Sequence, residues 1–380
     1  MTAAETGPHV RRRSLSLRRA ASLAALAPAL VGLVTAVAAD APTGVEKAVD
    51  RQVSAFMASH DVPGCSVAVG TGTRVVVAKG YGLAAPDAKA SADTIYRIGS
   101  VSKQFTAALA IRAHEERLSA APRLDLEAPV APYFPEAALP PRLTVRHLLH
   151  HSSGLESYTD YKDFHRGQFK PIGEGEMIAR IAGYERKFEP GARGHYSNSN
   201  YYLLARLLER HHRAGLDTLL STAITRPLGL ADTRRISRNP PSERTAQGSD
   251  ASGFITARTD PGWVAGAGDL LSTALDLAKW DQALLDGRLL SPAGAALMFA
   301  SRHANPDPAV VGERLAAGWM DVSDDSGRRF YHQGFVYGFS SVNAIEPPAA
   351  GHDGRFAVVL CNRYLVAGLP ALARRLLDAL

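Results

Sequence analysis

Apolar residues recur with two different spacings along this chain, and the order of these spacings predicts its fold. A helix-like spacing at 45–57 opens the folded part of the chain. Strand-like runs gather towards its two ends, at 65–69, 74–78, 329–335, 339–345 and 356–361. Helix-like runs fill the middle and close the chain, at 101–118, 145–151, 174–181, 201–211, 216–224, 274–285 and 369–380.

Strands at both ends with helices between them indicate an α/β domain built from both termini that holds an inserted, mostly helical domain. We place the α/β domain at 39–118 and 300–380, and the inserted domain at 119–299. The chain has 380 residues and is 46% hydrophobic, which is enough for a sizeable core. We expect a functional site at the junction of the two parts, where clefts commonly lie.

The first 38 residues have the composition of an export signal. Arginines at 11–13 and 18–19 precede an apolar run at 20–39, and Ala36-Val37-Ala38 offers a cleavage site of small residues. We therefore expect a signal peptide over 1–38 and a periplasmic or extracellular protein. Ordinary secretion and twin-arginine export both fit the pattern. An uncleaved membrane anchor is the alternative, because the apolar run approaches spanning length.

Charge and cysteine content narrow the function further. Four of the six net positive charges lie in the leader, so the rest of the chain has no electrostatic signature of nucleic-acid binding. The two cysteines, Cys65 and Cys361, both fall in apolar strand-like runs. We expect two buried free thiols. A disulfide between neighbouring strands is the alternative in an oxidising compartment.

The single Ser-x-x-Lys of the chain, Ser100 to Lys103, is the strongest candidate for chemistry. It begins a helix-like run, so the serine hydroxyl and the lysine amine share one helix face. A serine needs an adjacent base to become a nucleophile, and a lysine with a lowered pKa can serve. The helix start also directs backbone N–H groups at a developing oxyanion. Taken alone, the motif is more typical of a solvated surface helix.

A second motif, Tyr196-Ser197-Asn198, follows a Pro-Gly turn and lies on an expected loop before a helix. A phenol beside a lysine ammonium loses its proton more easily and can relay protons to a leaving group. The amide of Asn198 can bond both the lysine and a substrate carbonyl. We therefore expect Lys103 and Tyr196 to face each other across a cleft.

A third motif, His332-Gln333-Gly334, falls on an expected edge strand. A glycine on an edge strand lets substrate backbone approach. The N–H of the next residue, Phe335, is then able to complete an oxyanion hole with the N–H of Ser100.

Together and in this order, the three motifs resemble those of the penicillin-recognising serine hydrolases, which include class C β-lactamases, DD-carboxypeptidases and related esterases. The similarity covers most of the chain from about Val45, through the stretches 94–100, 148–155, 227–230 and 265–273. It implies a β-lactamase/transpeptidase-like fold, with an antiparallel sheet, flanking terminal helices and an inserted helical domain. It also implies an acyl-enzyme on Ser100, catalysis by Lys103 and Tyr196, and substrate binding by Asn198 and 332–335.

The substrate-binding strand departs from the family pattern. His332 and Gln333 stand where β-lactamases of this group carry lysine and threonine, so an imidazole of partial charge replaces a fixed cation. Phe335, Tyr337 and Phe339 are expected to make the surroundings apolar. The stretch 318–321 lacks the arginine with which related carboxypeptidases hold a carboxylate. These features favour esters or amides with an uncharged acyl part, ahead of D-amino-acid peptides and β-lactams.

Other chemistries find less support. His147, His150 and His151 lack an acidic partner at the spacing of a zinc site, and the resemblance makes His151 a turn residue. No Gly-x-Ser-x-Gly elbow or glycine-rich phosphate loop occurs. We expect no metal and no cofactor, a small-molecule or peptide substrate, no nucleic-acid partner, and membrane contact only through an uncleaved leader. A catalytically silent penicillin-binding sensor is the alternative of a different class.

Overall fold

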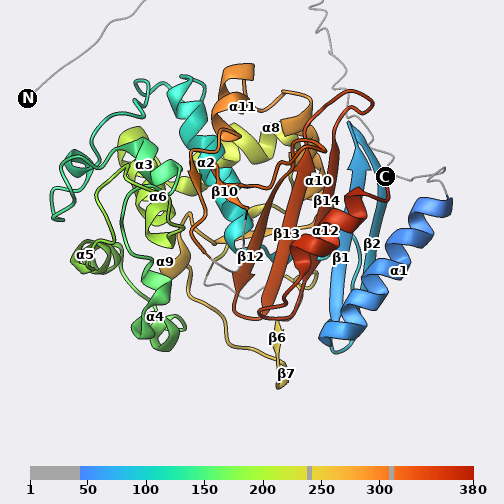
Figure 1. The fold of residues 1–380 in the computed structure, drawn as a ribbon. Coiled ribbons are helices and arrows are strands. Elements are labelled where there is room, and N and C mark those ends of the chain that lie inside the picture. The colour runs from blue at the N-terminus through green and yellow to red at the C-terminus, as the bar shows by residue number, and fades with distance from the viewer. Residues whose placement is uncertain (1–42, 238–241, 308–311) are drawn as a thin grey trace, which may run out of the picture. The chain divides into compact units, whose positions relative to one another are not determined.

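The computed structural model describes residues 43–237, 242–307 and 312–380. Its centre is a nine-stranded antiparallel sheet in the order β3-β2-β1-β14-β13-β12-β11-β10-β9 (Figure 1). The long strands are β1 (Gly64–Thr71), β2 (Arg74–Ala85), β12 (Phe330–Val336), β13 (Phe339–Glu346) and β14 (Arg355–Cys361). The short strands are β3 (Ala88–Lys89), β9 (His303–Ala304), β10 (Arg314–Leu315) and β11 (Met320–Asp321).

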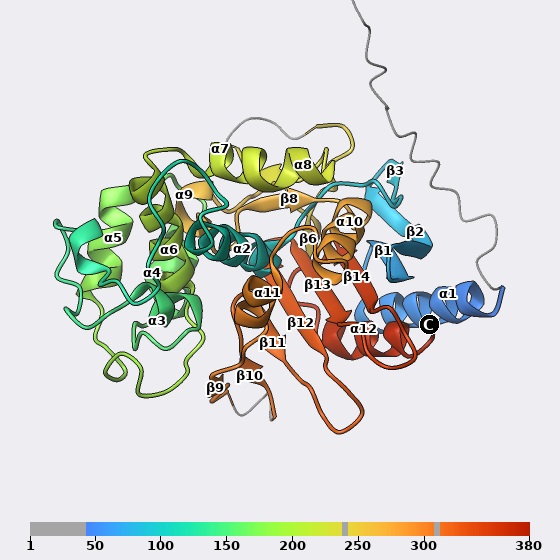
Figure 2. The same ribbon diagram turned by 90° about the horizontal axis from the view of Figure 1, so that it is seen from above.

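Alternate residues of the central strands enter two different cores. On β1, Val67 and Val69 belong to one apolar cluster and Ala68 to the other, and on β14 Val359 and Val358 divide in the same way. Because side chains alternate across a strand, a sheet covered on both faces needs continuous apolar runs. Helices α1 (Thr43–His60) and α12 (Leu369–Leu377) cover one face, and α10 (Ala274–Leu285) covers the other (Figures 1 and 2).

The remaining elements lie mostly beside the sheet (Figure 2). The helices are α2 (Ser102–His114), α3 (Val145–Leu149), α4 (Lys162–Gly167), α5 (Glu174–Gly183), α6 (Asn198–His212), α7 (Leu216–Leu220), α8 (Arg226–Leu228), α9 (Pro261–Val264) and α11 (Pro292–Met298). Shorter turns are η1 (Gly99–Val101), η2 (Ala131–Tyr133), η3 (Tyr158–Asp160) and the π-helical η4 (Ser221–Thr225). Small sheets join β4 (Tyr96–Arg97), β8 (Leu270–Ser272) and β5 (Arg234–Arg235), and β6 (Ser249–Asp250) with β7 (Gly253–Phe254). The division into two domains stays a prediction.

Several helices end earlier than their apolar patterns predict. The run 101–118 forms η1 and α2, which ends at His114, two residues before Glu116 adopts a left-handed backbone with φ 58°. The run 145–151 ends at Leu149, because His151 has φ 54° and turns the chain. An α-helix cannot continue through such a residue.

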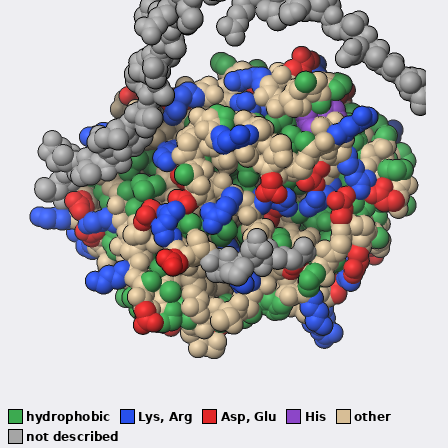
Figure 3. All heavy atoms as spheres, turned by 180° about the vertical axis from the view of Figure 1, so that it is seen from behind, with side chains coloured by type: hydrophobic (Ala, Val, Ile, Leu, Met, Phe, Trp, Pro, Cys, Tyr) green, Lys and Arg blue, Asp and Glu red, His purple; other side chains and the backbone are tan. Residues whose placement is uncertain are grey.

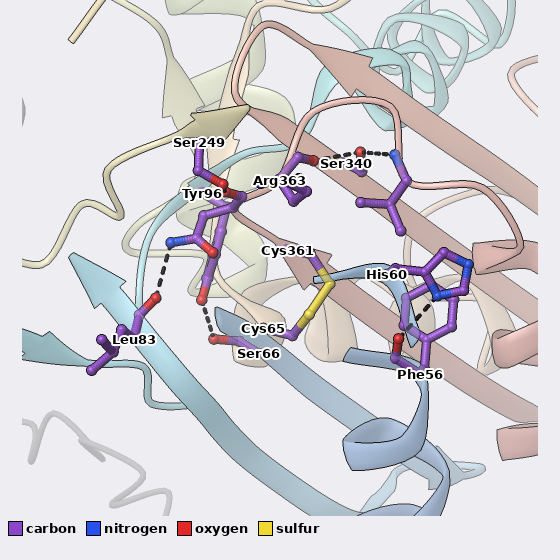
Figure 4. The surroundings of a disulfide bond; sticks show 12 residues. Phe56, His60, Cys65, Ser66, Leu83, Tyr96, Ser249, Ser340, Cys361 and Arg363 are labelled. Carbon is purple, nitrogen blue, oxygen red and sulfur yellow. Dashed lines mark hydrogen bonds between the residues drawn. A yellow bond between two sulfur atoms is a disulfide. The ribbon is translucent and has the colours of Figure 1, made fainter. Parts of the chain in front are cut away.

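The prediction of two free thiols is wrong, since Cys65 and Cys361 form a disulfide (Figure 4). The two residues are direct partners in the antiparallel register of β1 and β14, although 296 positions separate them in the sequence. Ser66, the next residue on β1, points to the opposite face and donates to the Tyr96 hydroxyl (3.0 Å). The pairing depends on strand adjacency, which the spacing of cysteines along the chain does not reveal.

The expected signal peptide and its alternative, a membrane anchor, fall on residues 1–38, outside the described residues. Within the described ranges, no helix is both long enough and apolar enough to cross a bilayer.

Candidate active site

Ser100 lies in the middle of η1, a turn held tightly between two strands. The N–H of Ile98 donates to Leu270 O on β8 (3.0 Å). Gly99 has φ 49°, and a Cβ at this position would lie 2.8 Å from the backbone nitrogen of Phe335 on β12. Only glycine fits such an approach in this conformation. The small-residue turn therefore brings Ser100 directly against β12.

The Lys103 amine lies at the centre of the site. Its Nζ is 3.0 Å from Ser100 Oγ, 2.7 Å from Asn198 Oδ1 and 2.6 Å from Ala267 O. Burial of the side chain holds the pKa of Lys103 well below its ordinary value, and the charge of Asp269 opposes this shift in part. A neutral amine has two N–H groups, enough for Asn198 and Ala267, and one lone pair, which faces Ser100. The arrangement presents Lys103 as a base for the serine proton.

The sequence predicted that Asn198 lies on the loop before a helix, but it is the first residue of α6. Two hydroxyl groups orient it. Ser157 Oγ accepts from the Asn198 backbone N–H (3.1 Å), and Thr159 Oγ1 accepts from its side-chain amide (2.8 Å). These donations leave the Asn198 carbonyl oxygen directed at Lys103. Sequence reasoning missed both hydroxyl residues, and no motif marks them.

Ala267 contributes its backbone carbonyl from a tight turn. The N–H of Gly266, which has φ 67°, donates to Asp269 Oδ1 (3.0 Å), and Asp269 forms an ion pair with Arg235 (2.6 Å). A Cβ on Gly266 would lie 2.2 Å from Ala205 on α6. The match of 265–273 to the family pattern was the signal for this turn, although it did not reveal that a carbonyl would contact Lys103.

Tyr196 lies beside Lys103, with the centre of its ring 5.0 Å from Nζ. The expectation that the lysine would ease loss of the phenol proton is wrong. Burial raises the pKa of Tyr196, and a hydrogen bond with Ser100 offsets only part of this shift. Because Lys103 is itself driven towards its neutral form, it provides little positive charge to stabilise a phenolate. Tyr196 is therefore a proton donor in the resting site.

The imidazole of His151 stacks on the ring of Tyr196. The two rings stack with their centres 4.6 Å apart. His151 Nδ1 lies 3.2 Å from the Ser197 backbone nitrogen and 3.1 Å from Asn200 Nδ2, both donors. Burial lowers the pKa of His151 well below its ordinary value, with a further contribution from Lys103. The sequence placed His151 in a turn, which is correct, and gave no indication of this stacking.

The backbone amides of Ser100 and Phe335 lie close together. A Cβ added to Gly334 would lie 2.9 Å from the Ser100 nitrogen, and a Cβ added to Gly99 would lie 2.8 Å from the Phe335 nitrogen. β12 pairs with β13 along its length but with β11 only at its first two residues. From His332 onward its other edge therefore meets η1 and has no partner strand among the described residues. The strand is an edge strand only in this half, where its open edge lies against the turn that carries Ser100.

His332 is almost fully buried, with 2% of its surface exposed. Burial, and to a lesser degree the charge of Lys103, lower the pKa of His332 to about 3. Its Nδ1 lies 2.6 Å from the Gln333 carbonyl oxygen and donates to it, which opposes this shift only in part, so the ring is neutral at neutral pH. The direction of this shift agrees with the sequence expectation, but burial contributes more than the lysine.

A cleft of about 580 Å³ contains the site. Of the eight predicted site residues, six line it: Ser100, Tyr196, Asn198, His332, Gln333 and Phe335. Acidic side chains also line it (Asp160, Asp307, Glu313), and no lysine or arginine is among the described lining residues. Tyr337 lines the cleft as expected. Phe339 does not, because it begins β13, one strand further from η1, and packs edge-on against Tyr96 (6.4 Å).

A group able to hold a metal lies at one side of this cleft, and it does not include His147, His150 or His151, which the sequence analysis had weighed and set aside. Across the described ranges, the only such group is Glu156, Asp160 and His195, whose ligand atoms lie within 4.8 Å of one another. Lys187 forms an ion pair with Glu156 (3.1 Å) and so competes with a cation for that carboxylate. We assign no metal to this group.

Comparisons with known proteins agree with this geometry. A family model described as Beta-lactamase matches residues 49–380. An unguisins hydrolase from Aspergillus campestris is 27% identical over 313 residues, covering 75% of this chain and 56% of that protein. A D-aminopeptidase from Gluconobacter oxydans is 28% identical over 243 residues, covering 61% of this chain and 44% of that protein. The chain thus spans about half the length of these curated relatives.

Solved structures share the fold. The octameric penicillin-binding protein homologue from Pyrococcus abyssi has a TM-score of 0.74 and 26% identity, covering 87% of this chain and 75% of that one. The D-amino acid amidase from Ochrobactrum anthropi has a TM-score of 0.74 and 22% identity, covering 88% and 98%. The fold is therefore of the β-lactamase/transpeptidase-like type that the motifs implied. Because the family match extends over nearly the whole described chain, the protein belongs to the beta-lactamase family of serine hydrolases.

Proposed function

We propose that this protein hydrolyses esters or amides through an acyl-enzyme on Ser100, and that it prefers acyl groups without a carboxylate. The observation that carries the first part is the contact between Lys103 Nζ and Ser100 Oγ at 3.0 Å, in a site whose burial favours the neutral amine. A base and a nucleophile within hydrogen-bond distance form the minimal unit of covalent hydrolysis.

The proposed reaction uses each group in turn. Lys103 takes the Ser100 proton as Oγ bonds to the substrate carbonyl carbon, and the resulting oxyanion faces the amides of Ser100 and Phe335. When the intermediate collapses, the bond to the leaving group breaks. The leaving group takes a proton from the Tyr196 phenol, which regains one from the Lys103 ammonium. Water then attacks the acyl-enzyme by the same route and releases the acid. Because the base form of Lys103 is required, activity falls as pH drops through its lowered pKa.

The charges of the cleft support the substrate preference. A neutral His332 provides no fixed cation for a carboxylate, and the described lining has acidic side chains and no basic one besides histidines. A carboxylate entering this cleft would lose hydration without gaining an ion pair. Esters and amides with neutral acyl groups avoid this cost.

A second candidate function is the hydrolysis of amides whose acyl part carries an ammonium group, as in D-amino acid amides. Asp160 favours it, because this exposed carboxylate lines the cleft and has no ion-pair partner among the described residues. The similarity to a D-aminopeptidase points in the same direction. β-Lactam turnover and silent penicillin binding remain the alternatives that experiment must separate.

One labelling experiment and one substrate panel test the proposal. A fluorescent phosphonate should add one label per molecule by intact mass, and Ser100→Ala should abolish the addition. Labelling of the alanine variant at the wild-type rate would refute Ser100 as the nucleophile. The panel compares the hydrolysis rates of four substrates: p-nitrophenyl butyrate, a D-amino acid p-nitroanilide, nitrocefin and a D-Ala-D-Ala peptide. Labelling without turnover of any of these would favour a silent sensor.

We also propose that the protein is exported, through the leader at 1–38. The disulfide supports this, because structural disulfides persist in oxidising compartments. On the face shown in Figure 3, basic and acidic side chains are interspersed, so this face offers no continuous surface for nucleic acid. Fractionation of the native host, with intact mass of the recovered protein, tests export and cleavage. Recovery of the full-length chain with reduced cysteines in the cytosol would contradict both.

A further inference from the structure

A second cavity, of about 570 Å³, lies beside the small sheet β4-β8-β5 and away from Ser100. Its apolar lining includes Ile236, Leu271 and Phe339. Its charged lining consists of three arginines, Arg97, Arg234 and Arg258, and no aspartate or glutamate is among the described residues that line it. The volume is in the range of small-molecule sites in proteins.

Strand register explains why two of these arginines meet. Leu271 on β8 pairs with Arg97 on β4 and with Arg234 on β5. Directly opposed residues in a sheet project from the same face, so both guanidinium groups flank Leu271 on one side of the small sheet. Arg258 joins them from the segment that follows β7.

Arg97 is a buried cation that forms no ion pair with a described residue. Only 6% of its surface is exposed, and among the described residues its one hydrogen bond runs from Nη1 to Thr259 O (3.0 Å). Burial lowers the pKa of Arg97 to about 10, and the like charge of Arg258 adds to this shift. Asp260 opposes it from a distance and also accepts from the Gly262 N–H (2.9 Å). Arg97 therefore stays charged at neutral pH without forming an ion pair within the described chain.

The other two arginines also lack carboxylate partners in the described ranges. Arg258 is exposed and forms no hydrogen bond or ion pair with a described residue. Arg234 is exposed, and its one hydrogen bond to a described residue is donated to a backbone carbonyl, Asp232 O (3.2 Å). Unpaired arginines also occur elsewhere, since Arg244 pairs with Asp232 (2.5 Å) whereas Arg51 has no acidic partner among the described residues. What distinguishes this cavity is that three such guanidinium groups line one apolar space and that one of them is buried.

We propose that this cavity binds a small amphiphilic anion, with a carboxylate or phosphate head held by Arg97, Arg234 and Arg258 and a short apolar body against Leu271 and Phe339. Guanidinium groups bind both head groups through paired N–H donors. Such a ligand offsets part of the positive charge of the three arginines and covers the apolar wall in one step. The inference concerns a site other than the cleft and does not depend on the proposed hydrolase activity.

Calorimetric titration of the full-length protein tests the site, with hexyl phosphate and hexanoate as probes and hexanol as the uncharged control. We expect saturable binding of one anion per chain and no binding of hexanol. The two probes distinguish a phosphate head from a carboxylate head. Arg258→Ala and Arg234→Ala should each weaken binding at least tenfold. Both residues are exposed, so the folded state should survive their substitution.

A matched control is Arg51→Ala, because Arg51 is exposed on α1 and also lacks a hydrogen bond or ion pair with a described residue. It should bind like the unchanged protein. Absence of saturable binding by both probes would overturn the proposal, and so would equal affinity in the Arg258→Ala and Arg51→Ala variants. If inorganic phosphate binds as tightly as hexyl phosphate, the apolar wall has no role and the amphiphile assignment is wrong.

Discussion

Two cavities of nearly equal volume, the cleft of about 580 Å³ and the arginine-lined cavity of about 570 Å³, lie beside different buried cations. Beside the cleft, the buried Lys103 has three oxygen atoms as hydrogen-bond partners within 3.0 Å. In the second cavity, the buried Arg97 has a single carbonyl acceptor within the described part of the chain. A lysine can release a proton and keep its hydrogen bonds, whereas an arginine keeps its charge. The same burial therefore produces a base in one cavity and a site for an anion in the other.

The largest effect expected from this comparison is at Lys103. Lys103→Met removes the amine but retains the length of the buried side chain, so turnover should fall by about a thousandfold or more. Single-turnover acylation by a p-nitrophenyl ester measures the loss, with circular dichroism as a check of folding. The control is Lys47→Met at an exposed position on α1. Acylation within tenfold of the unchanged protein would exclude Lys103 as the base.

His150 extends the comparison, because it is a buried base without a hydrogen-bond partner among the described residues. Neither ring nitrogen has a partner there, and burial lowers the pKa of His150 to about 3. The unfolded chain binds a proton below a pKa of about 6.5 and the folded chain does not, so stability is lost as pH falls from about 6.5 towards 3.

Replacing His150 with leucine should remove this acid-specific loss. Relative to the unchanged protein, the free energy of unfolding of His150→Leu should improve by about 2 kcal/mol more at pH 5 than at pH 8. Urea unfolding at the two pH values measures the difference, with the exposed His165→Leu as control. A pH-independent effect of His150→Leu would show that the folded protein protonates this ring.

A charge introduced at His332 should change substrate choice. His332→Lys places a cation on β12, and we expect the ratio of kcat/KM for a carboxylate-bearing substrate to that for its neutral ester to rise about tenfold, or about 1.4 kcal/mol. His332→Gln, which stays neutral, should leave the ratio nearly unchanged. A tenfold preference for the carboxylate in the unchanged protein would contradict the proposed preference and favour the peptidase alternative.

The smallest effect concerns Asp160. An exposed carboxylate contributes about 0.5–1 kcal/mol to a single ion pair, so Asp160→Asn should lower kcat/KM for a D-amino acid p-nitroanilide by about two- to fivefold. Hydrolysis of p-nitrophenyl butyrate should not change, and neither should either activity in Asp87→Asn, an exposed position outside the cleft. Equal losses on both substrates would remove the reason for the second candidate function.

Sequence patterns predicted the parts of the molecule that depend on local spacing. Ser100 and Lys103 meet because a turn leads into a helix, and the central strands were recognisable from their continuous apolar runs. Properties that depend on which strands become neighbours were not predictable. The Cys65–Cys361 pairing and the position of Phe339 both require the register of the sheet. The pKa of Tyr196 depends on burial by residues distant in sequence, so its direction was also missed.

The order of strands in the central sheet has a consequence for how the protein is made. β1 leaves the ribosome early, and β2 follows at once to pair with one of its edges. The other edge must wait for β14, whose Cys361 lies 296 residues after Cys65. An unpaired edge with both faces apolar is prone to join another chain. Nascent chains of this protein therefore need protection until their last strand has been synthesised, and truncation before β14 leaves β1 permanently exposed.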